Sequence, residues 1–66
     1  MHPLAIYRKE KGLTQQDLAE RLGIHKVYLA LIETYKKTPS TKLALKIEQL
    51  TGVGRLDVLY PKASGE

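Results

Sequence analysis

The chain has 66 residues and contains no cysteine. Neither a disulfide nor a cysteine-bound metal can therefore hold it together, and the two histidines, His2 and His25, lie too far apart to indicate a zinc site. A chain of this length buries only roughly 60% of the surface that its unfolded form exposes. Because 42% of the residues are apolar, we expect one small domain with a compact core and marginal stability, and no metal or cofactor.

Long apolar runs and catalytic patterns are also missing. No stretch approaches the roughly 18 apolar residues of a membrane span, and no charged segment followed by an apolar one indicates export. The segment Gly52-Val53-Gly54 lacks the Lys-Ser/Thr pair that follows a phosphate-binding loop, and neither histidine has a partner at a catalytic spacing. We therefore expect no membrane association, no small-molecule ligand and no enzymatic activity.

Acidic residues are fewer than basic ones, with 7 Asp and Glu against 11 Lys and Arg and a net charge of +4. Clustered Lys and Arg are typical of a nucleic-acid surface, but small basic domains without that role are common, so charge alone leaves both interpretations open. Most of the basic residues gather in two short segments, which contain Arg8, Lys9, Lys11, Lys36, Lys37 and Lys42.

Helix start and stop signals divide the chain into short helices, and no segment shows a strand pattern. Thr14 is a good N-cap and is followed three residues later by Asp17, which resembles a capping box. Ser40 is a second N-cap, and Gly23 and Gly52 are typical of helix ends. With apolar residues at helical spacing between these signals, the pattern predicts five helices, at about residues 3–11, 15–22, 25–33, 41–51 and 55–60.

The second and third predicted helices form a distinctive pair. They are about eight residues each and meet at Gly23, which permits a sharp corner. Ala19 is small enough to let the two helices cross closely, as in a helix-turn-helix. An ordinary helical hairpin in a small bundle is the alternative, and the setting among five short helices favours the helix-turn-helix.

Several motifs along this segment and beyond it point to a family: Lys11-Gly12-Leu13-Thr14-Gln15, Asp17-Leu18-Ala19, Leu22-Gly23, Ile32-Glu33 and Pro39-Ser40. With them, residues 4–60 closely resemble the phage repressor and Cro-like helix-turn-helix domains of the xenobiotic-response-element type. The resemblance implies an all-α, compact five-helix lambda-repressor-like DNA-binding domain at residues 1–61, followed by a frayed tail at 62–66. It also implies a Cro- or repressor-like transcriptional regulator in the cytoplasm, encoded by a bacterium or a phage, that reads an operator in double-stranded DNA.

The family places its third helix in the major groove, and here that helix carries more apolar residues than a core needs. Leu29 and Ile32 should face the core, which leaves Val27, Ala30 and Leu31 on the opposite face. These three side chains could pack against thymine methyl groups, or the face could pack against another subunit. Lys26, at the edge of this face, could donate to guanine or lie against a phosphate. The predicted base-contacting residues are Lys26, Val27, Ala30 and Leu31.

Six further residues are predicted to contact the DNA backbone: Gln15, His25, Lys36, Lys37, Ser40 and Thr41. The family's glutamine at the position of Gln15 reaches a phosphate and braces the recognition helix. His25 stands at a cap position that is usually Ser or Thr in this family, which predicts a weaker cap, and it could donate to a phosphate or be a solvated surface histidine. Ser40 and Thr41 could offer a hydroxyl and a helix-start N–H.

Two further expectations concern the support of this helix. The resemblance implies an ion pair between Arg8 and Glu33 that joins the first predicted helix to the third. The family often has a glycine two residues after the glutamate, where this chain has Tyr35. Because tyrosine is poorly suited to a left-handed conformation, either the helix ends differently or Tyr35 is strained.

The sequence is compatible with several kinds of partner. We expect a homodimer on DNA, joined through a C-terminal surface of Leu45, Val53, Val58 and Tyr60, while monomer and dimer both stay open in solution. An antitoxin-like or other protein-interaction module that uses the same apolar helix face is the alternative function. A non-specific nucleoid or RNA-binding protein ranks lower, because aromatic residues make up only 6% of the chain and are scattered.

Overall fold

The computed structural model describes residues 1–61, so the tail predicted at 62–66 lies outside the described residues. Within them the chain is all-helical and has no strand. The five predicted helices are confirmed, each within a residue or two of the expected bounds. They are α1 (Pro3–Glu10), α2 (Gln15–Leu22), α3 (Lys26–Glu33), α4 (Thr41–Thr51) and α5 (Arg55–Leu59).

The helices begin and end where the polar side chains and glycines require. Thr14 Oγ1 accepts from the Asp17 backbone N–H at 3.0 Å, and Asp17 Oδ2 accepts from the Thr14 N–H at 3.0 Å, which completes the capping box. The hydrogen bond from the Thr14 N–H to the carboxylate lowers the pKa of Asp17, and the Thr14 side chain lowers it further. Gly23 ends α2 in a left-handed conformation with a φ of 72°, and Ser40 Oγ accepts from the Leu43 N–H at 3.1 Å to start α4.

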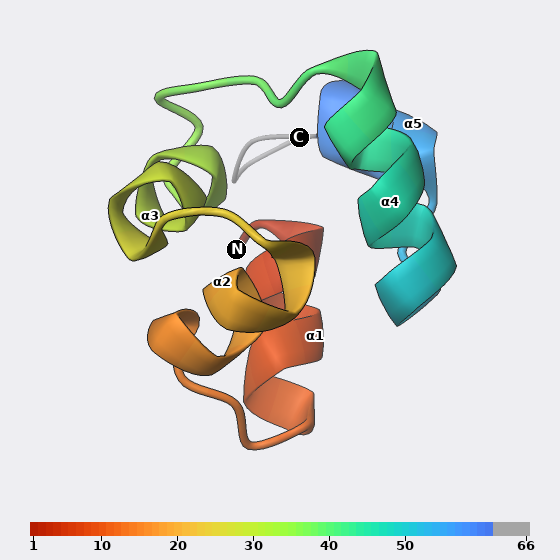
Figure 1. Cartoon of the computed structure of the whole chain (residues 1–66). Coiled ribbons are helices and arrows are strands. Elements are labelled where there is room, and N and C mark those ends of the chain that lie inside the picture. Colours follow the sequence, from red (N-terminus) through yellow and green to blue (C-terminus); the bar gives the residue numbers. More distant parts are fainter. Residues whose placement is uncertain (62–66) are drawn as a thin grey trace.

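Two groups of helices share one core. In Figure 1, α1, α2 and α3 lie on one side of the molecule and α4 and α5 lie together on the other. Ala19 is buried, which lets α2 and α3 cross closely at the corner that Gly23 makes. The side chains buried between the helices are Leu4, Leu18, Ala19, Leu22, Leu29, Ile32, Ala44, Ile47 and Val58.

One expectation about the C-terminal surface is wrong. Val58 is only 1% exposed and belongs to the core, and Val53 is partly buried against that core. The short helix α5 has few residues with which to anchor itself, and Val58 is the one that it buries. Leu56 and Tyr60 are instead the exposed large side chains at this end of the described chain.

Candidate nucleic-acid interface

Helix α3 separates its side chains into a buried set and an accessible set. Leu29, Ile32 and Glu33 are buried, as expected for the face toward the core. Lys26 is exposed and the side chain of Val27 is 59% exposed, although valine is apolar. Ala30 and Leu31 are half-buried, and neither belongs to the core cluster. The four residues predicted to contact bases are therefore the ones that the core leaves accessible.

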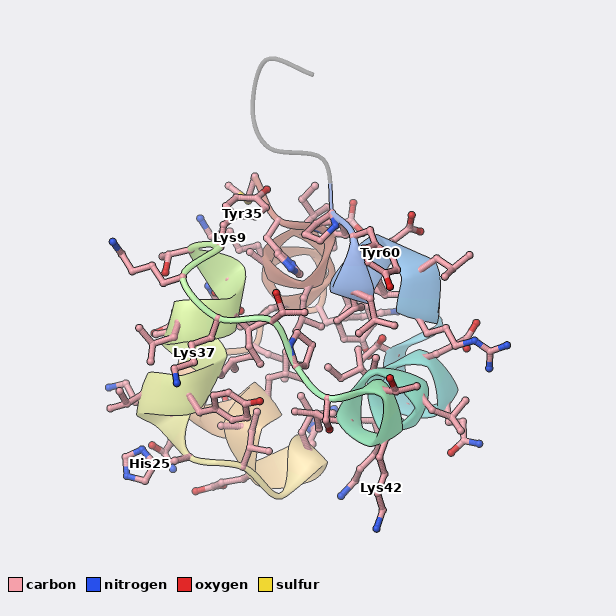
Figure 2. All side chains as sticks on the ribbon, turned by 90° about the horizontal axis from the view of Figure 1, so that it is seen from above. Lys9, His25, Tyr35, Lys37, Lys42 and Tyr60 are labelled. Atoms are coloured by element: carbon pink, nitrogen blue, oxygen red, sulfur yellow. The ribbon has the colours of Figure 1, made fainter. Side chains whose placement is uncertain are left out.

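The N-terminus of α3 is capped by an imidazole. His25 Nδ1 accepts from the Val27 backbone N–H at 3.1 Å. The capping hydrogen bond is therefore made, although the sequence predicts a weaker cap than Ser or Thr would give. A ring nitrogen that accepts a hydrogen bond carries no proton, so the neutral ring holds its proton on Nε2. Figure 2 shows His25 at the outer edge of the molecule, beside the start of α3. The histidine thus caps the helix and has a donor left for another partner.

A buried polar cluster ties α3 to the first two helices. Arg8 Nε lies 2.9 Å from Glu33 Oε2, and Arg8 Nη2 donates to Glu33 Oε1 at 3.0 Å. The two side chains are only 13% and 5% exposed, and Arg8 Nη1 also donates to the Leu13 carbonyl at 3.1 Å. Arg8 and Glu33 therefore form the ion pair that the resemblance implied. Its two parallel hydrogen bonds fix the orientation of the guanidinium relative to the carboxylate.

Gln15 joins the same cluster from the first turn of α2. Its Nε2 donates to Glu33 Oε1 at 3.1 Å, a bond that sequence spacing does not predict. This bond provides the bracing that the family's glutamine implied, because it fixes the start of α2 to the end of α3. A carboxamide has two N–H donors and a carbonyl oxygen, so contact between Gln15 and a phosphate stays a prediction.

The starts of α2 and α3 border a common hollow. The N-cap Thr14 and the first two residues of α2, Gln15 and Gln16, line it on one side, and Lys26 lines it from the first turn of α3. Backbone N–H groups in the first turn of a helix favour an anion; at the start of α2 the capping box uses those of Thr14 and Asp17 and leaves those of Gln15 and Gln16 as donors. With a lysine ammonium on the opposite side, this hollow suits a phosphate oxygen.

Tyr35 resolves the question that the sequence left open about the end of α3. Among the described residues it is the one non-glycine with a positive φ, 64°. The Tyr35 N–H donates to the Ile32 carbonyl at 3.1 Å, and the Lys36 N–H donates to the Leu31 carbonyl at 2.9 Å. This pair of bonds is the Schellman motif, which usually has glycine where Tyr35 stands. The family's helix end is thus kept, at a conformational cost of about 1–2 kcal/mol for a residue with a Cβ.

The loop that follows and the start of α4 carry further basic residues. Lys36, Lys37 and Lys42 are exposed, whereas Pro39 is buried and anchors the loop. In Figure 2, Lys37 lies on the loop beside α3, and Lys42 projects from α4 on the same lower side of the view as His25. The exposed residues Ser40 and Thr41 lie between the two lysines, at the start of α4. The residues predicted to contact phosphates therefore lie at helix starts and on the loop around α3.

Two further features are absent from the described part of the chain. Residues 1–61 contain no group of three or more His, Asp or Glu side chains that could hold a metal ion. No helix among these residues is long and apolar enough to cross a membrane.

These features define a helix-turn-helix protein: two short helices meet at a glycine corner, and the second helix is fixed to the core on one face and accessible on the other. The chain belongs to the helix-turn-helix family, whose model matches residues 4–58. The predicted family and fold are thereby confirmed.

Several curated proteins are similar over most of their length. An uncharacterized HTH-type transcriptional regulator of Methanocaldococcus jannaschii is 44% identical over 55 residues, which cover 83% of each chain. Regulators with the same description in Sinorhizobium fredii and Methanothermobacter thermautotrophicus are 32% and 35% identical and cover 86% and 82% of this chain, and 74% and 78% of their own. No solved structure matches the chain significantly.

Proposed function

We propose that this chain is a transcription regulator that binds double-stranded DNA and recognises its operator by inserting α3 into the major groove. The observation that carries this proposal is the accessible face of α3, where Lys26 and Val27 are exposed although the opposite face is fully used by the core. Family membership and the regulators to which the chain is similar support it. Such a protein would act in the cytoplasm.

The side chains divide into two roles in this proposal. Lys26, Val27, Ala30 and Leu31 would face the base edges, where a lysine donates to guanine and apolar groups contact the thymine methyl. Phosphates would be held by Gln15 and His25 on one side of α3 and by Lys36, Lys37, Ser40 and Thr41 on the other. Phosphate contacts fix the register of the helix in the groove, and base contacts supply the specificity.

We further propose that the protein binds as a homodimer and acts as a Cro-like repressor by occupying its operator. One copy covers a single half-site, and two copies would match half-sites about one helical turn, roughly 34 Å, apart. Because Val58 is buried, the surface that joins the copies must use other residues. Leu56 and Tyr60, which is 76% exposed, lie four residues apart near α5, and Leu45 on α4 is also exposed.

Footprinting the protein on the DNA that flanks its own gene tests the proposal and identifies the operator. Titrating a full operator and an isolated half-site then tests the dimer. We expect one protected site, tighter binding to the full operator and two chains per operator. Equal affinity for both DNAs, with one chain per operator, would contradict the dimer and leave the assignment to DNA binding intact.

Salt dependence separates this function from the alternative of a protein-interaction module. Binding through several phosphates weakens steeply as salt rises, whereas a largely apolar protein interface is much less sensitive. The exposed Val27 is compatible with either partner, so exposure alone does not separate the two functions. The salt dependence is therefore measured with the wild-type chain on the footprinted site. No footprint and no salt-dependent DNA binding would favour the interaction module.

A further inference from the structure

The first residues of the chain hold a buried imidazole that none of the proposed DNA contacts uses. His2 caps α1 and is only 1% exposed. Its Nδ1 accepts from the Leu4 backbone N–H at 3.0 Å. As at His25, an accepting Nδ1 requires the neutral ring. The difference is that the ring of His2 lies inside the protein.

The ring of His2 faces the residue that ends the recognition helix. The ring centroids of His2 and Tyr35 are 5.3 Å apart and the ring planes are tilted by 47°. Tyr35 is the one non-glycine of the described residues with a positive φ, a conformation that is unfavourable for a residue with a Cβ and persists only where the surroundings hold it. Contact with a fixed, buried ring supplies such a restraint.

Directly after Tyr35 the backbone folds back against the end of α3, and the loop that carries Lys36 and Lys37 begins. The N–H groups of Lys36 and Lys37 both donate to the Leu31 carbonyl, at 2.9 and 3.1 Å. A cleft runs beneath this turn, between the end of α3, the loop and the end of α5. Its walls include His2, Tyr35, Lys37 and Tyr60.

We propose that neutral His2 is a positioning residue for the DNA-binding loop: it holds Tyr35 in the left-handed conformation that directs Lys36 and Lys37, and protonation of its ring releases them. The part of this inference that concerns DNA rests on the proposed function. The part that concerns the loop does not, because it can be measured in the free protein.

The surroundings of His2 support the neutral ring. Burial lowers the pKa of His2 below its ordinary value of 6.5; Glu33 at the end of α3 raises this pKa, and the amino group of Met1 lowers it. Lys37 from the loop, Tyr35 and Tyr60 are the other titratable groups at the cleft. A group with a lowered pKa contributes stability above the pKa of its unfolded form, and this contribution is lost as the pH falls through the folded pKa. The hold on the loop should therefore weaken in mild acid.

Hydrogen exchange of single backbone amides in the free protein tests the link. Protection factors of the Lys36 and Lys37 amides, corrected for intrinsic exchange, are measured in steps from about pH 7.5 down through the ordinary histidine range and below it, because the pKa of His2 is lowered. The Ala44 amide, which donates to the Ser40 carbonyl at 2.8 Å, serves as the reference. We expect several-fold lower protection at Lys36 and Lys37 in acid and an unchanged value at Ala44.

Two matched variants make the test specific. His2→Asn keeps a cap acceptor but removes both the titration and the ring, so Lys36 and Lys37 should be weakly protected at every pH. His25→Asn makes the same exchange at the exposed cap and should keep the wild-type response. Unchanged loop protection in the wild type, the same response in both variants, or a parallel loss at Ala44 would each overturn the inference.

The DNA consequence is read from the salt dependence of binding to the footprinted operator. Each phosphate contact contributes a slope of about −0.9 to a plot of log affinity against log salt. Loss of the contacts of Lys36 and Lys37 should therefore reduce the slope by about one to two in acid, in wild type but not in His2→Asn. A slope that does not change with pH in the wild type would overturn the DNA part. If the loop responds as expected but no DNA is bound at any pH, the proposed function fails and the link between His2 and the loop stands.

Discussion

The two faces of α3 differ in burial and in the contacts that their side chains make. The inner face is closed: Leu29 and Ile32 are buried, and the charge of Glu33 is neutralised by Arg8 and hydrogen-bonded to Gln15. The outer face is accessible, and because Lys26 and Val27 are exposed they contribute little to the stability of the fold. The inner face therefore determines where the helix lies, and the outer face can vary without loss of the fold. Substitutions on the two faces should separate folding from recognition.

The largest effect is expected at Glu33. Replacing Glu33 by Ala leaves the guanidinium of Arg8 buried without its partner, which should reduce the free energy of unfolding by roughly 3–5 kcal/mol. Urea unfolding of both proteins measures the difference. Glu48→Ala is the matched control, because the Arg55–Glu48 pair is exposed and its atoms are 3.8 Å apart, so its loss should cost less than about 1 kcal/mol. A decrease below ~0.5 kcal/mol for Glu33→Ala would contradict a structural role for the pair.

A slightly smaller loss is expected from a cavity on the same face. Leu29 has no exposed surface, so Leu29→Ala should cost about 2–5 kcal/mol, out of a total of roughly 3–10 kcal/mol for a chain of this length. Val27→Ala shortens an apolar side chain on the open face of the same helix and should change stability by less than about 0.5 kcal/mol. Thermal melts of the pair check this contrast, and equal losses would show that the outer face also packs in the folded protein.

Sequence patterns predicted the architecture because the signals that set it are local. The caps at Thr14 and Ser40 and the glycine at position 23 act on their immediate neighbours, so the helix bounds followed from them. The pairing of Arg8 with Glu33 spans 25 residues and was available only through the family resemblance. The details that sequence missed depend on tertiary packing.

Three details of the site illustrate that dependence. The bond from Gln15 to Glu33 requires α2 and α3 to cross at the observed angle, and no spacing rule encodes that angle. The conformation of Tyr35 was open from sequence because its left-handed φ needs outside support, and His2 lies against its ring. Val58 was expected at the surface because apolar periodicity in a helix of five residues does not distinguish the two sides.

Recognition should change when the accessible face is altered, and for the exposed Lys26 it should change without loss of stability. Lys26→Ala and Leu31→Ala should each shift which base pairs are preferred, by about 1–3 kcal/mol at the affected position. Affinities on a panel of single-base operator variants measure the shift. Lys9→Ala removes an exposed lysine from α1 and serves as the charge-matched control with an unchanged preference profile. Unchanged profiles for both α3 variants would falsify the assignment of this face to base recognition.

The smallest effect is expected at Lys37, on the loop that flanks the open face. Lys37 is exposed and lies beside α3 in Figure 2, so it can contact a phosphate but is not part of the helix that reads bases. Lys37→Ala should weaken binding to every operator variant alike and reduce the salt slope by about one. Lys9→Ala again controls for the loss of one positive charge and should leave the slope nearly unchanged. A changed base preference for Lys37→Ala would extend recognition beyond α3, and the division of the helix into a supporting face and a reading face would no longer account for specificity.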